Sequence, residues 1–330
     1  MPDATRPPLT PGHAEQHWTA RHGKPIIFVI LTLVAAGVYL ATTIPVAVFP
    51  EAQGLTDDQL QQIAREMNLS ETVFVFPPTD PAAVVRLRIF TPTQEIPFAG
   101  HPVVGTMHVL AQLGMIATPE PVTRVVQECN IGCFPVDLLM RDGQVMRVVM
   151  TQPQPQFLER VEDTEDLYKV AAALGIPKHT IADTKWPVEV VSTGLPVLVV
   201  PVRTLTAVRS INPDPSAIVD LCGRFGANGI TAFTTVTVEP FSNVHSRMFA
   251  PAIGIPEDPA TGSASGALGA YLVQNGIVEV SPKIEIVIEQ GYEVERPSRI
   301  LVQIESDGQA IHSVKVGGQC VMVMEGTLSF

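Results

Sequence analysis

Hydrophobic and polar positions along the chain follow two periods, one helical and one strand-like. Residues 56–69 place apolar side chains at near-helical spacing, and Thr56 or Asp57 can cap the first turn, which predicts an amphipathic helix. Short runs rich in Val, Ile and Phe follow, and the pair Asp142 and Gly143 is typical of a hairpin turn. The 30 prolines also favour turns and short strands over a helical bundle.

Two segments differ from this pattern because they form long, nearly uncharged helical runs. Residues 95–114 and 257–276 each pass from an acidic residue through a glycine turn into an apolar helix, and a strand-like run with Arg and Phe precedes each. Helices with so little charge are typical of positions surrounded by protein. The two segments align at Gly100 with Gly262, His101 with Ser263, Leu110 with Leu272, Gln112 with Gln274 and Gly114 with Gly276. We infer an internal duplication.

The start of the second apolar helix suits an anionic ligand. Asp258 and Thr261 can cap it, and the backbone N–H groups of Gly262, Ser263 and Ala264 have no partner within the helix. These N–H groups carry partial positive charge, which attracts a carboxylate or a phosphate. We expect the two duplicated halves to direct their helix ends into one shared cleft.

The order of the predicted elements indicates an α+β fold with two halves. The strands lack the regular βαβ spacing of a doubly wound sheet, and each half has one buried helix. A length of 330 residues also favours two domains. The Gln-Pro stretch at 152–156 predicts a boundary between an N-terminal half at 45–152 and a C-terminal half at 153–330.

The region before the first half has two parts. Residues 1–24 are polar and rich in proline, so we expect a flexible tail. Residues 25–44 carry no charge, and the span from Ile26 to Ile44 is long enough to cross a bilayer as a helix of about 20 residues. Four interpretations stay open: a membrane anchor, a signal sequence, a buried strand, or a misassigned start of the coding sequence.

Composition argues against several classes of function. The chain has 33 acidic and 21 basic residues, a net charge of -12, and no basic stripe, so we expect no nucleic-acid partner. Its 4 cysteines lack the paired spacing of a zinc site, and we take them as free thiols. The sequence contains no phosphate-binding loop and no dinucleotide motif. We therefore expect neither a metal nor a cofactor.

Five motifs carry a resemblance to a known family: AREMNLSETVFV, RIFTPTQEIPFAGHPVVGT, SRMFAP, EDPATGSASG and EQGYEVERPS. Together they resemble the phenazine-biosynthesis PhzF-like isomerases, and the resemblance covers Pro45 to Phe330. It implies the diaminopimelate epimerase-like fold, in which each of two similar domains is a curved, mostly antiparallel sheet or barrel around a central helix. The active site then lies between the domains, and the protein is commonly a homodimer. The uncharged span before Pro45 departs from the family, which has a first strand leading into Gly-Asn-Pro.

The resemblance also implies roles for individual residues. Glu71 matches the family's acid/base glutamate, and enclosure at a domain interface raises the pKa of a glutamate toward the range useful for proton transfer. We expect His101 to hydrogen-bond the substrate and Asp258 to orient it or relay a proton. The expected substrate-binding residues are Gly100, Gly262 and Ser263. From the residues alone, Glu71 could instead be a surface glutamate, His101 a structural histidine and Asp258 an N-cap.

The sequence thus predicts a cofactor-independent isomerase that moves a proton and a double bond on a small cyclic amino- or hydroxy-carboxylate, similar to trans-2,3-dihydro-3-hydroxyanthranilate. One alternative is an amino-acid or proline-type epimerase on the same fold, which the absence of cysteine from both glycine turns disfavours. The other is a catalytically silent protein that binds a small carboxylate, which the presence of Glu71 disfavours. We expect a cytoplasmic homodimer, with membrane attachment left open by the span from Ile26 to Ile44.

Overall fold

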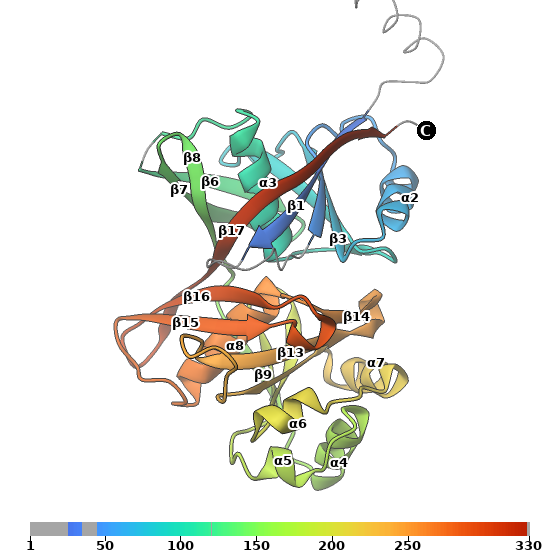
Figure 1. Ribbon diagram of the computed structural model, residues 1–330, viewed down its shortest axis with the longest axis vertical. Coiled ribbons are helices and arrows are strands. Elements are labelled where there is room, and N and C mark those ends of the chain that lie inside the picture. The colour runs from blue at the N-terminus through green and yellow to red at the C-terminus, as the bar shows by residue number, and fades with distance from the viewer. Residues whose placement is uncertain (1–25, 35–44, 120, 329–330) are drawn as a thin grey trace, which may run out of the picture.

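The computed structural model describes residues 26–34, 45–119 and 121–328 of the chain. The fold is α+β with two lobes, shown one above the other in Figure 1. Each lobe curves its strands around one central helix, α3 (His101–Gln112) in the upper lobe and α8 (Gly262–Gln274) in the lower. The prediction that both apolar helices are buried is confirmed, because nearly every residue of each is buried.

The upper lobe contains the first strands and one amphipathic helix. Its strands are β1 (Ile26–Val34), β2 (Pro45–Phe49), β3 (Glu71–Phe76), β4 (Val85–Phe90), β5 (Glu95–Ile96), β6 (Val122–Cys129), β7 (Gly132–Arg141) and β8 (Gln144–Thr151). The predicted amphipathic helix is α2 (Asp57–Met67), and Thr56 caps it through a reciprocal pair of hydrogen bonds with Gln59. Its apolar side, including Leu60 and Ile63, packs on the outer face of the strands.

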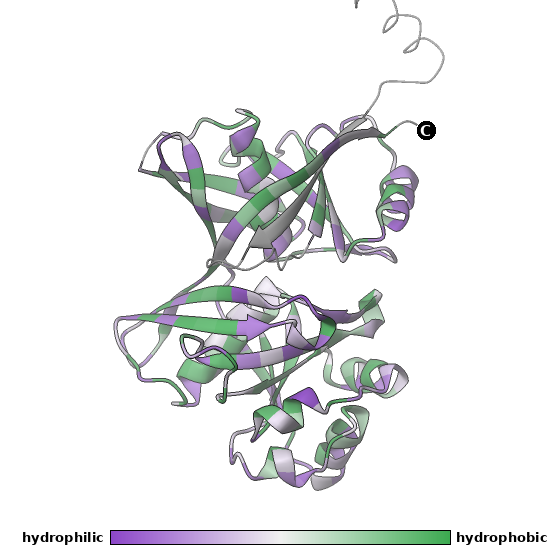
Figure 2. Cartoon of the chain, viewed as in Figure 1, coloured by the Kyte–Doolittle hydropathy of each residue, from purple (hydrophilic) through white to green (hydrophobic). Residues whose placement is uncertain are grey.

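The lower lobe contains the remaining strands and a layer of helices on its outer side. The strands are β9 (Gln156–Arg160), β10 (Glu189–Ser192), β11 (Pro196–Pro201), β12 (Ile230–Thr234), β13 (Val244–Ala250), β14 (Ile255–Asp258), β15 (Lys283–Gln290), β16 (Ser298–Ser306) and β17 (Ile311–Leu328). The helices are α4 (Thr164–Ala173), α5 (His179–Ala182), α6 (Leu205–Arg209), α7 (Pro215–Phe225), η1 (Pro251–Ile253) and η2 (Tyr292–Val294). Burial alternates along β16 and the first part of β15, although each strand contains three consecutive hydrophobic residues, 286–288 in β15 and 300–302 in β16 (Figure 2).

Strand β17 joins the two lobes. It pairs antiparallel with β16 in the lower lobe, where Ile304 faces Val314, and then with β8 in the upper lobe, where Val316 faces Met150. Its last part pairs with β1 along the upper lobe, and Figure 1 shows it as one long ribbon that spans both. The division of the chain at residue 152 remains a proposal, in which β17 crosses from one half to the other.

The uncharged span near the N-terminus forms a strand over the part that the structure describes. Residues Ile26–Val34 are β1, which pairs antiparallel with β2 and β17. This agrees with the interpretation of the span as a strand of the fold rather than the start of a transmembrane helix. Among the described residues, no helix has the length and apolar character to cross a bilayer. The rest of the span, residues 35–44, and the tail at 1–24 lie outside the described residues.

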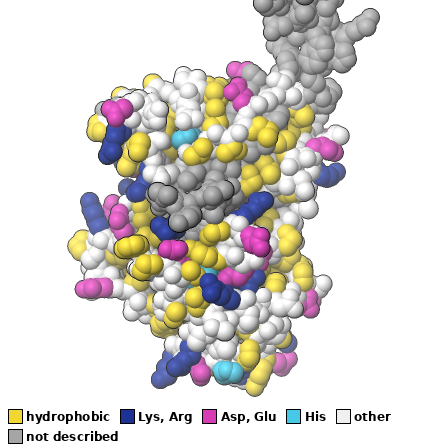
Figure 3. All heavy atoms as spheres, in the orientation of Figure 1, with side chains coloured by type: hydrophobic (Ala, Val, Ile, Leu, Met, Phe, Trp, Pro, Cys, Tyr) yellow, Lys and Arg dark blue, Asp and Glu magenta, His cyan; other side chains and the backbone are white. Residues whose placement is uncertain are grey.

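The internal duplication is visible in the strand register. Strand β3 pairs with β4 so that Thr72 faces Phe90, and β12 pairs with β13 so that Ile230 faces Phe249. In both lobes the second of these strands also runs parallel to a later one, β4 with β6 and β13 with β15. The surface, by contrast, shows no such regularity: acidic and basic side chains are interspersed over both lobes on the face seen in Figure 3.

Candidate active site

Glu71, His101 and Asp258 lie together between the lobes. Glu71 is the first residue of β3, His101 is the first residue of α3, and Asp258 is the last residue of β14. Their exposed fractions are 5%, 5% and 3%, and one side-chain oxygen or nitrogen of each lies within 4.8 Å of the others. The structure therefore brings the three predicted catalytic residues into one cluster, and Glu71 is not a surface residue.

The local fold explains the position of Glu71. Helix α2 ends at Asn68 in the left-handed conformation (φ 49°), a conformation that asparagine tolerates better than most residues. The chain then turns back into β3, which pairs parallel to β2 with Glu71 beside Val46. The chain therefore passes from helix α2, on the outside of the lobe, to Glu71, whose carboxylate faces the pocket.

The two central helices meet at their N-terminal ends. A Cβ atom added to Gly100 would lie 2.6 Å from the Cα of Gly262, and one added to Gly262 would lie 3.0 Å from the Cα of Gly100. A side chain at Gly100 would force the backbone of the other turn to move, and one at Gly262 would be tightly packed, so the close approach favours glycine on both sides. The close approach brings His101 and Ser263, the next residue of each helix, to the same pocket.

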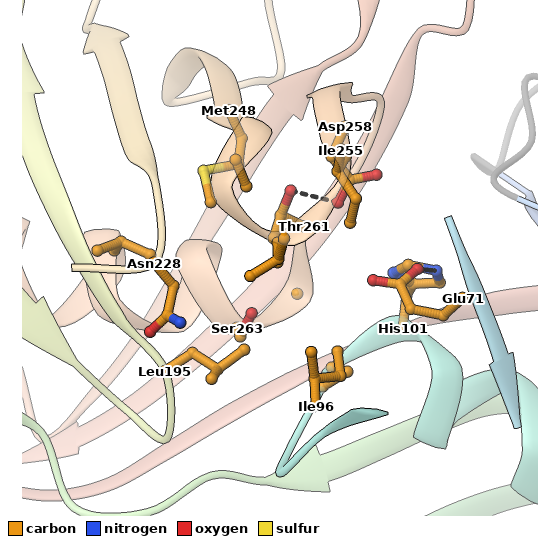
Figure 4. A pocket seen from close by; sticks show the side chains of 16 residues that line it. Glu71, Ile96, His101, Leu195, Asn228, Met248, Ile255, Asp258, Thr261 and Ser263 are labelled. Carbon is orange, nitrogen blue, oxygen red and sulfur yellow. Dashed lines mark hydrogen bonds and ion pairs between the residues drawn. The ribbon is translucent and has the colours of Figure 1, made fainter. Parts of the chain in front are cut away.

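A narrow cavity, about 30 Å³ in volume for water-sized molecules, opens between these groups. One end is acidic and basic, and the walls are mostly apolar, as Figure 4 shows. All six predicted site residues line it. The full lining is Glu71, Ile96, Ala99, Gly100, His101, Leu195, Val197, Asn228, Met248, Ala250, Ile253, Ile255, Asp258, Thr261, Gly262 and Ser263.

Charge couples the three titratable groups. Nε2 of His101 lies 3.0 Å from Oε2 of Glu71. Burial disfavours the protonated imidazole, but the carboxylates of Glu71 and Asp258 outweigh this effect and raise the pKa of His101. Burial, together with the charge of Glu71, raises the pKa of Asp258 to about 6, although His101 and the hydroxyl of Thr261 act in the opposite direction. The site therefore holds protons near neutral pH.

A layer of polar residues supports Asp258. The hydroxyl of Thr261 donates to Oδ2 of Asp258 at 2.6 Å, and Nε2 of Gln290 donates to the Asp258 carbonyl oxygen. Oδ1 of Asp258 is buried and has no hydrogen-bond partner among the described residues. The sequence-based expectation that Thr261 caps α8 is wrong, because its hydroxyl binds Asp258 and makes no capping bond to the helix.

A second pair of polar residues fixes the first turn of α8. Nε2 of Gln152 donates to the carbonyl oxygen of Gly262 at 3.0 Å. The hydroxyl of Thr193 donates to Oε1 of Gln152 at 2.6 Å and lies 3.2 Å from the carbonyl oxygen of Ser263. Sequence reasoning missed both residues. Gln152 lies in the stretch interpreted as a linker, and its place after a predicted strand was the available signal.

The side chains of Glu71, His101 and Asp258 are also of types that bind metal ions in proteins. One imidazole and two carboxylates form a donor set found at divalent metal sites. The set equally suits proton transfer, because burial and the charge of a neighbouring carboxylate raise the pKa of a carboxyl group toward neutrality. Cysteine-based chemistry has no candidate here, since none of the residues lining the pocket is a cysteine.

Comparisons with known proteins agree with this arrangement. The sequence profile of the family described as phenazine biosynthesis-like protein, PhzC-PhzF, matches residues 43–326. The chain is 35% identical over 286 residues to a trans-2,3-dihydro-3-hydroxyanthranilate isomerase from Pseudomonas aeruginosa, covering 86% of this chain and 92% of that protein. It is 33% identical over 285 residues to an uncharacterized isomerase from Clostridium acetobutylicum, covering 86% and 92%.

Solved structures show the same fold. A phenazine biosynthesis protein of the PhzF family from Bacillus anthracis superposes with a TM-score of 0.80 at 25% identity, covering 92% of this chain and 99% of that one. A hydroxyproline epimerase from Agrobacterium vitis shares the fold alone, with a TM-score of 0.66, 14% identity, and coverage of 94% and 92%. With the family profile matching most of the chain, the conclusion is direct: this protein belongs to the PhzC-PhzF phenazine biosynthesis-like family and is a PhzF-like isomerase.

Proposed function

We propose that this isomerase moves a proton and a double bond on a small cyclic amino- or hydroxy-carboxylate, with Glu71 as the acid/base. The observation that carries the proposal is the convergence of Glu71, His101 and Asp258 with the first turns of α3 and α8 on one pocket. The relatives named trans-2,3-dihydro-3-hydroxyanthranilate isomerases support a substrate of that class. The PhzF-like sequence and the lack of cysteine in the pocket favour this reaction over epimerisation.

The mechanism follows from the position of each group. The carboxylate of Glu71 takes a proton from one carbon of a conjugated substrate and returns it to another, so the bonding electrons shift along the double bonds and no net charge is left. His101, which the neighbouring carboxylates keep protonated to higher pH, donates a hydrogen bond to the negative charge that develops in between. Asp258 orients a substrate amine or hydroxyl through its unpaired oxygen.

The first turns of the two helices hold the carboxylate of the substrate in this proposal. The backbone N–H groups that follow Gly100 and Gly262 carry the partial positive charge of a helix N-terminus. Apolar walls formed by residues such as Leu195, Val197 and Met248 suit a flat ring. The cavity is narrower than a ring requires, so we expect the lobes to open for the substrate to enter and then to close around it.

Incubation with trans-2,3-dihydro-3-hydroxyanthranilate in D₂O tests the proposal. We expect a product with a shifted double bond and deuterium on carbon, both detected by proton NMR. Deuterium at a stereocentre with inversion and no moved double bond would identify an epimerase instead. Binding without any exchange would identify a silent carboxylate-binding protein. The Glu71→Gln variant serves as the control for exchange that does not depend on the site.

A further inference from the structure

Asn228 lies at the end of the pocket opposite the Glu71 and His101 pair, beside Ser263 and Leu195 (Figure 4). It is half-buried and stands two residues before β12, in a turn that sequence reasoning passed over. Its backbone N–H donates to the carbonyl oxygen of Pro196 at 2.8 Å, which anchors the turn without help from the side chain. The carboxamide is therefore not needed to hold its own segment.

The duplication places Asn228 in a position related to that of Glu71. Thr72 faces Phe90 in the upper lobe as Ile230 faces Phe249 in the lower lobe, so Glu71 corresponds to Gly229. Both strand starts line or adjoin the pocket, one from each lobe. The upper lobe places the carboxylate of Glu71 at the start of its strand, whereas the lower lobe places the carboxamide of Asn228, the residue before Gly229, at the pocket.

Two polar groups at this end of the pocket have no partner among the described residues. The hydroxyl of Ser263 makes no hydrogen bond there, although its residue is only 5% exposed. The carboxamide of Asn228 likewise makes none, and Figure 4 shows it extended toward Ser263 and Leu195. Both residues line the pocket beside the N-terminus of α8, so their unpartnered side chains can bind a ligand there.

We propose that Asn228 recognises the carboxylate of the substrate, with its Nδ2–H donating to one carboxylate oxygen while Ser263 and the first turn of α8 bind the other. The inference rests on the function proposed above and adds a binding residue to it. A carboxylate matches this end because the amide and the hydroxyl can each donate to it, and the helix N–H groups can only donate. The carboxylates of Glu71 and Asp258 lie with His101 toward the other end of the pocket (Figure 4).

Replacement of Asn228 by alanine or by aspartate tests the proposal through binding alone, without a measurement of turnover. The probes are 3-hydroxyanthranilate, a planar aromatic analogue of the proposed substrate, and its primary amide, 3-hydroxyanthranilamide, with affinities measured by calorimetry. A hydrogen bond to a charged group corresponds to roughly a 10-fold to 100-fold change in affinity. We expect Asn228→Ala to weaken binding of the acid by about that factor and to weaken binding of the amide less, because a hydrogen bond to a neutral carbonyl group is weaker.

Asn228→Asp gives the sharper result. The new carboxylate repels the acid but accepts a hydrogen bond from the amide, so the preference of the wild-type protein for the acid should reverse. Asn212→Asp adds the same charge at an exposed loop position and should keep the wild-type preference. For the proposed reaction, Asn228→Ala should raise KM and keep kcat within a few-fold.

The outcomes separate this inference from the function on which it rests. If the wild-type protein prefers the acid and both Asn228 variants keep that preference, the assignment of Asn228 is wrong and the proposed function stands. If the wild-type protein binds neither probe, or binds both equally, the carboxylate class of substrate is wrong and both proposals fail. An equal loss of binding to both probes in Asn228→Ala would indicate a structural role and would also overturn the assignment.

Discussion

The two lobes share one frame of strands and ion pairs, yet they differ at the residues that face the pocket. In the upper lobe Arg88 on β4 forms a two-pronged ion pair with Glu95, at 2.9 and 2.6 Å. In the lower lobe Arg247 on β13 forms the same pair with Glu257, at 2.8 and 2.7 Å. Each acidic partner stands five residues before the glycine at the start of the central helix. The ion pair thus fixes the glycine turn in both halves.

The pocket-facing positions have no such symmetry. Glu71 corresponds to Gly229, Ile96 to Asp258, and His101 to Ser263. The upper lobe therefore supplies a carboxylate and an imidazole, and the lower lobe supplies the second carboxylate and the polar residues of the far end. A pocket with unlike walls holds a substrate in one orientation, which an isomerase requires if a proton is to leave one carbon and reach another. Duplication preserved the frame while the two walls diverged.

Removal of the carboxylate from the upper wall should have the largest effect. Glu71→Gln keeps the shape of the side chain but cannot shuttle a proton, and general acid/base groups contribute about 10²-fold to 10⁴-fold in rate. We expect kcat to fall by that factor while substrate binding persists, as measured by deuterium exchange and calorimetry. Glu66→Gln, an exposed position on α2, is the matched control and should be neutral. If Glu71→Gln keeps full activity, Glu71 is not the acid/base, and Asp258 becomes the candidate for that role.

The equivalent ion pairs should differ in their contribution to stability. Arg247 and Glu257 have side chains 6% and 13% exposed, and Arg247 also donates to the carbonyl oxygens of Val208 and Ile211. Removing one partner of a buried pair costs about 3–5 kcal/mol, so Arg247→Met should lower the free energy of unfolding by about that amount. The more exposed Arg88 should cost about 1 kcal/mol in Arg88→Met. Equal losses in urea unfolding would contradict the comparison.

Much of this frame could be predicted from the sequence because it depends on local patterns. Capping and helical period identified α2, and low charge with terminal glycines identified the buried helices α3 and α8. The glycine turns and the resemblance led to Glu71, His101 and Asp258, which the structure places in one cluster, and their catalytic roles stay a prediction. The span from Ile26 was ambiguous because a run without charge has no period that separates a helix from a strand. The antiparallel pairing of β1 with β2 and with β17, which comes from the other end of the chain, shows that residues 26–34 form a strand.

The supporting polar residues could not be predicted for a related reason. Gln152, Thr193, Gln290 and Asn228 lie in turns or at strand ends, and each reaches the site through contacts between segments distant in sequence. No local pattern marks a glutamine as the partner of a particular carbonyl group. Thr261 shows the opposite error, because a residue with good capping chemistry makes its bond to a carboxylate instead. Tertiary contact, rather than local propensity, determines these roles.

A substitution at the contact between the two glycine turns should have a smaller effect on stability, and it should alter both lobes. A methyl group on Gly100 would lie 2.6–2.8 Å from backbone atoms of Gly262 and Ser263, which cannot move independently of α8. Overpacking of this kind costs about 1–3 kcal/mol, so Gly100→Ala should lower the melting temperature and also kcat, since it separates the two walls. Gly223→Ala on α7, where the added methyl group meets nothing within 4 Å, should instead be neutral or stabilising. Unchanged activity in Gly100→Ala would show that the lobes tolerate this separation.

The smallest effect on stability concerns the second carboxylate, Asp258, and its size depends on pH. The folded protein raises the pKa of Asp258 from 3.8 to about 6, so the native state binds a proton more tightly than the unfolded chain does. Stability contributed by this group is therefore present at low pH and is lost as pH rises from about 4 to about 6. Asp258→Asn removes that loss and should stabilise the protein above pH 6, by on the order of 1 kcal/mol because neighbouring groups titrate with it.

Asp307→Asn provides a control of opposite sign. Backbone N–H groups of Ala310 and Gln309 lower the pKa of Asp307 to about 2, so its contribution is present above pH 4 and is lost as pH falls. Urea unfolding between pH 4 and 8 should show the two variants departing from the wild-type curve in opposite directions. If Asp258→Asn has the same stability as the wild-type protein at every pH, the charge of His101 in the upper lobe compensates the charge of Asp258 in the folded protein. In that case His101 of the upper lobe and Asp258 of the lower lobe would form one ion pair across the pocket, and the two lobes would not act independently.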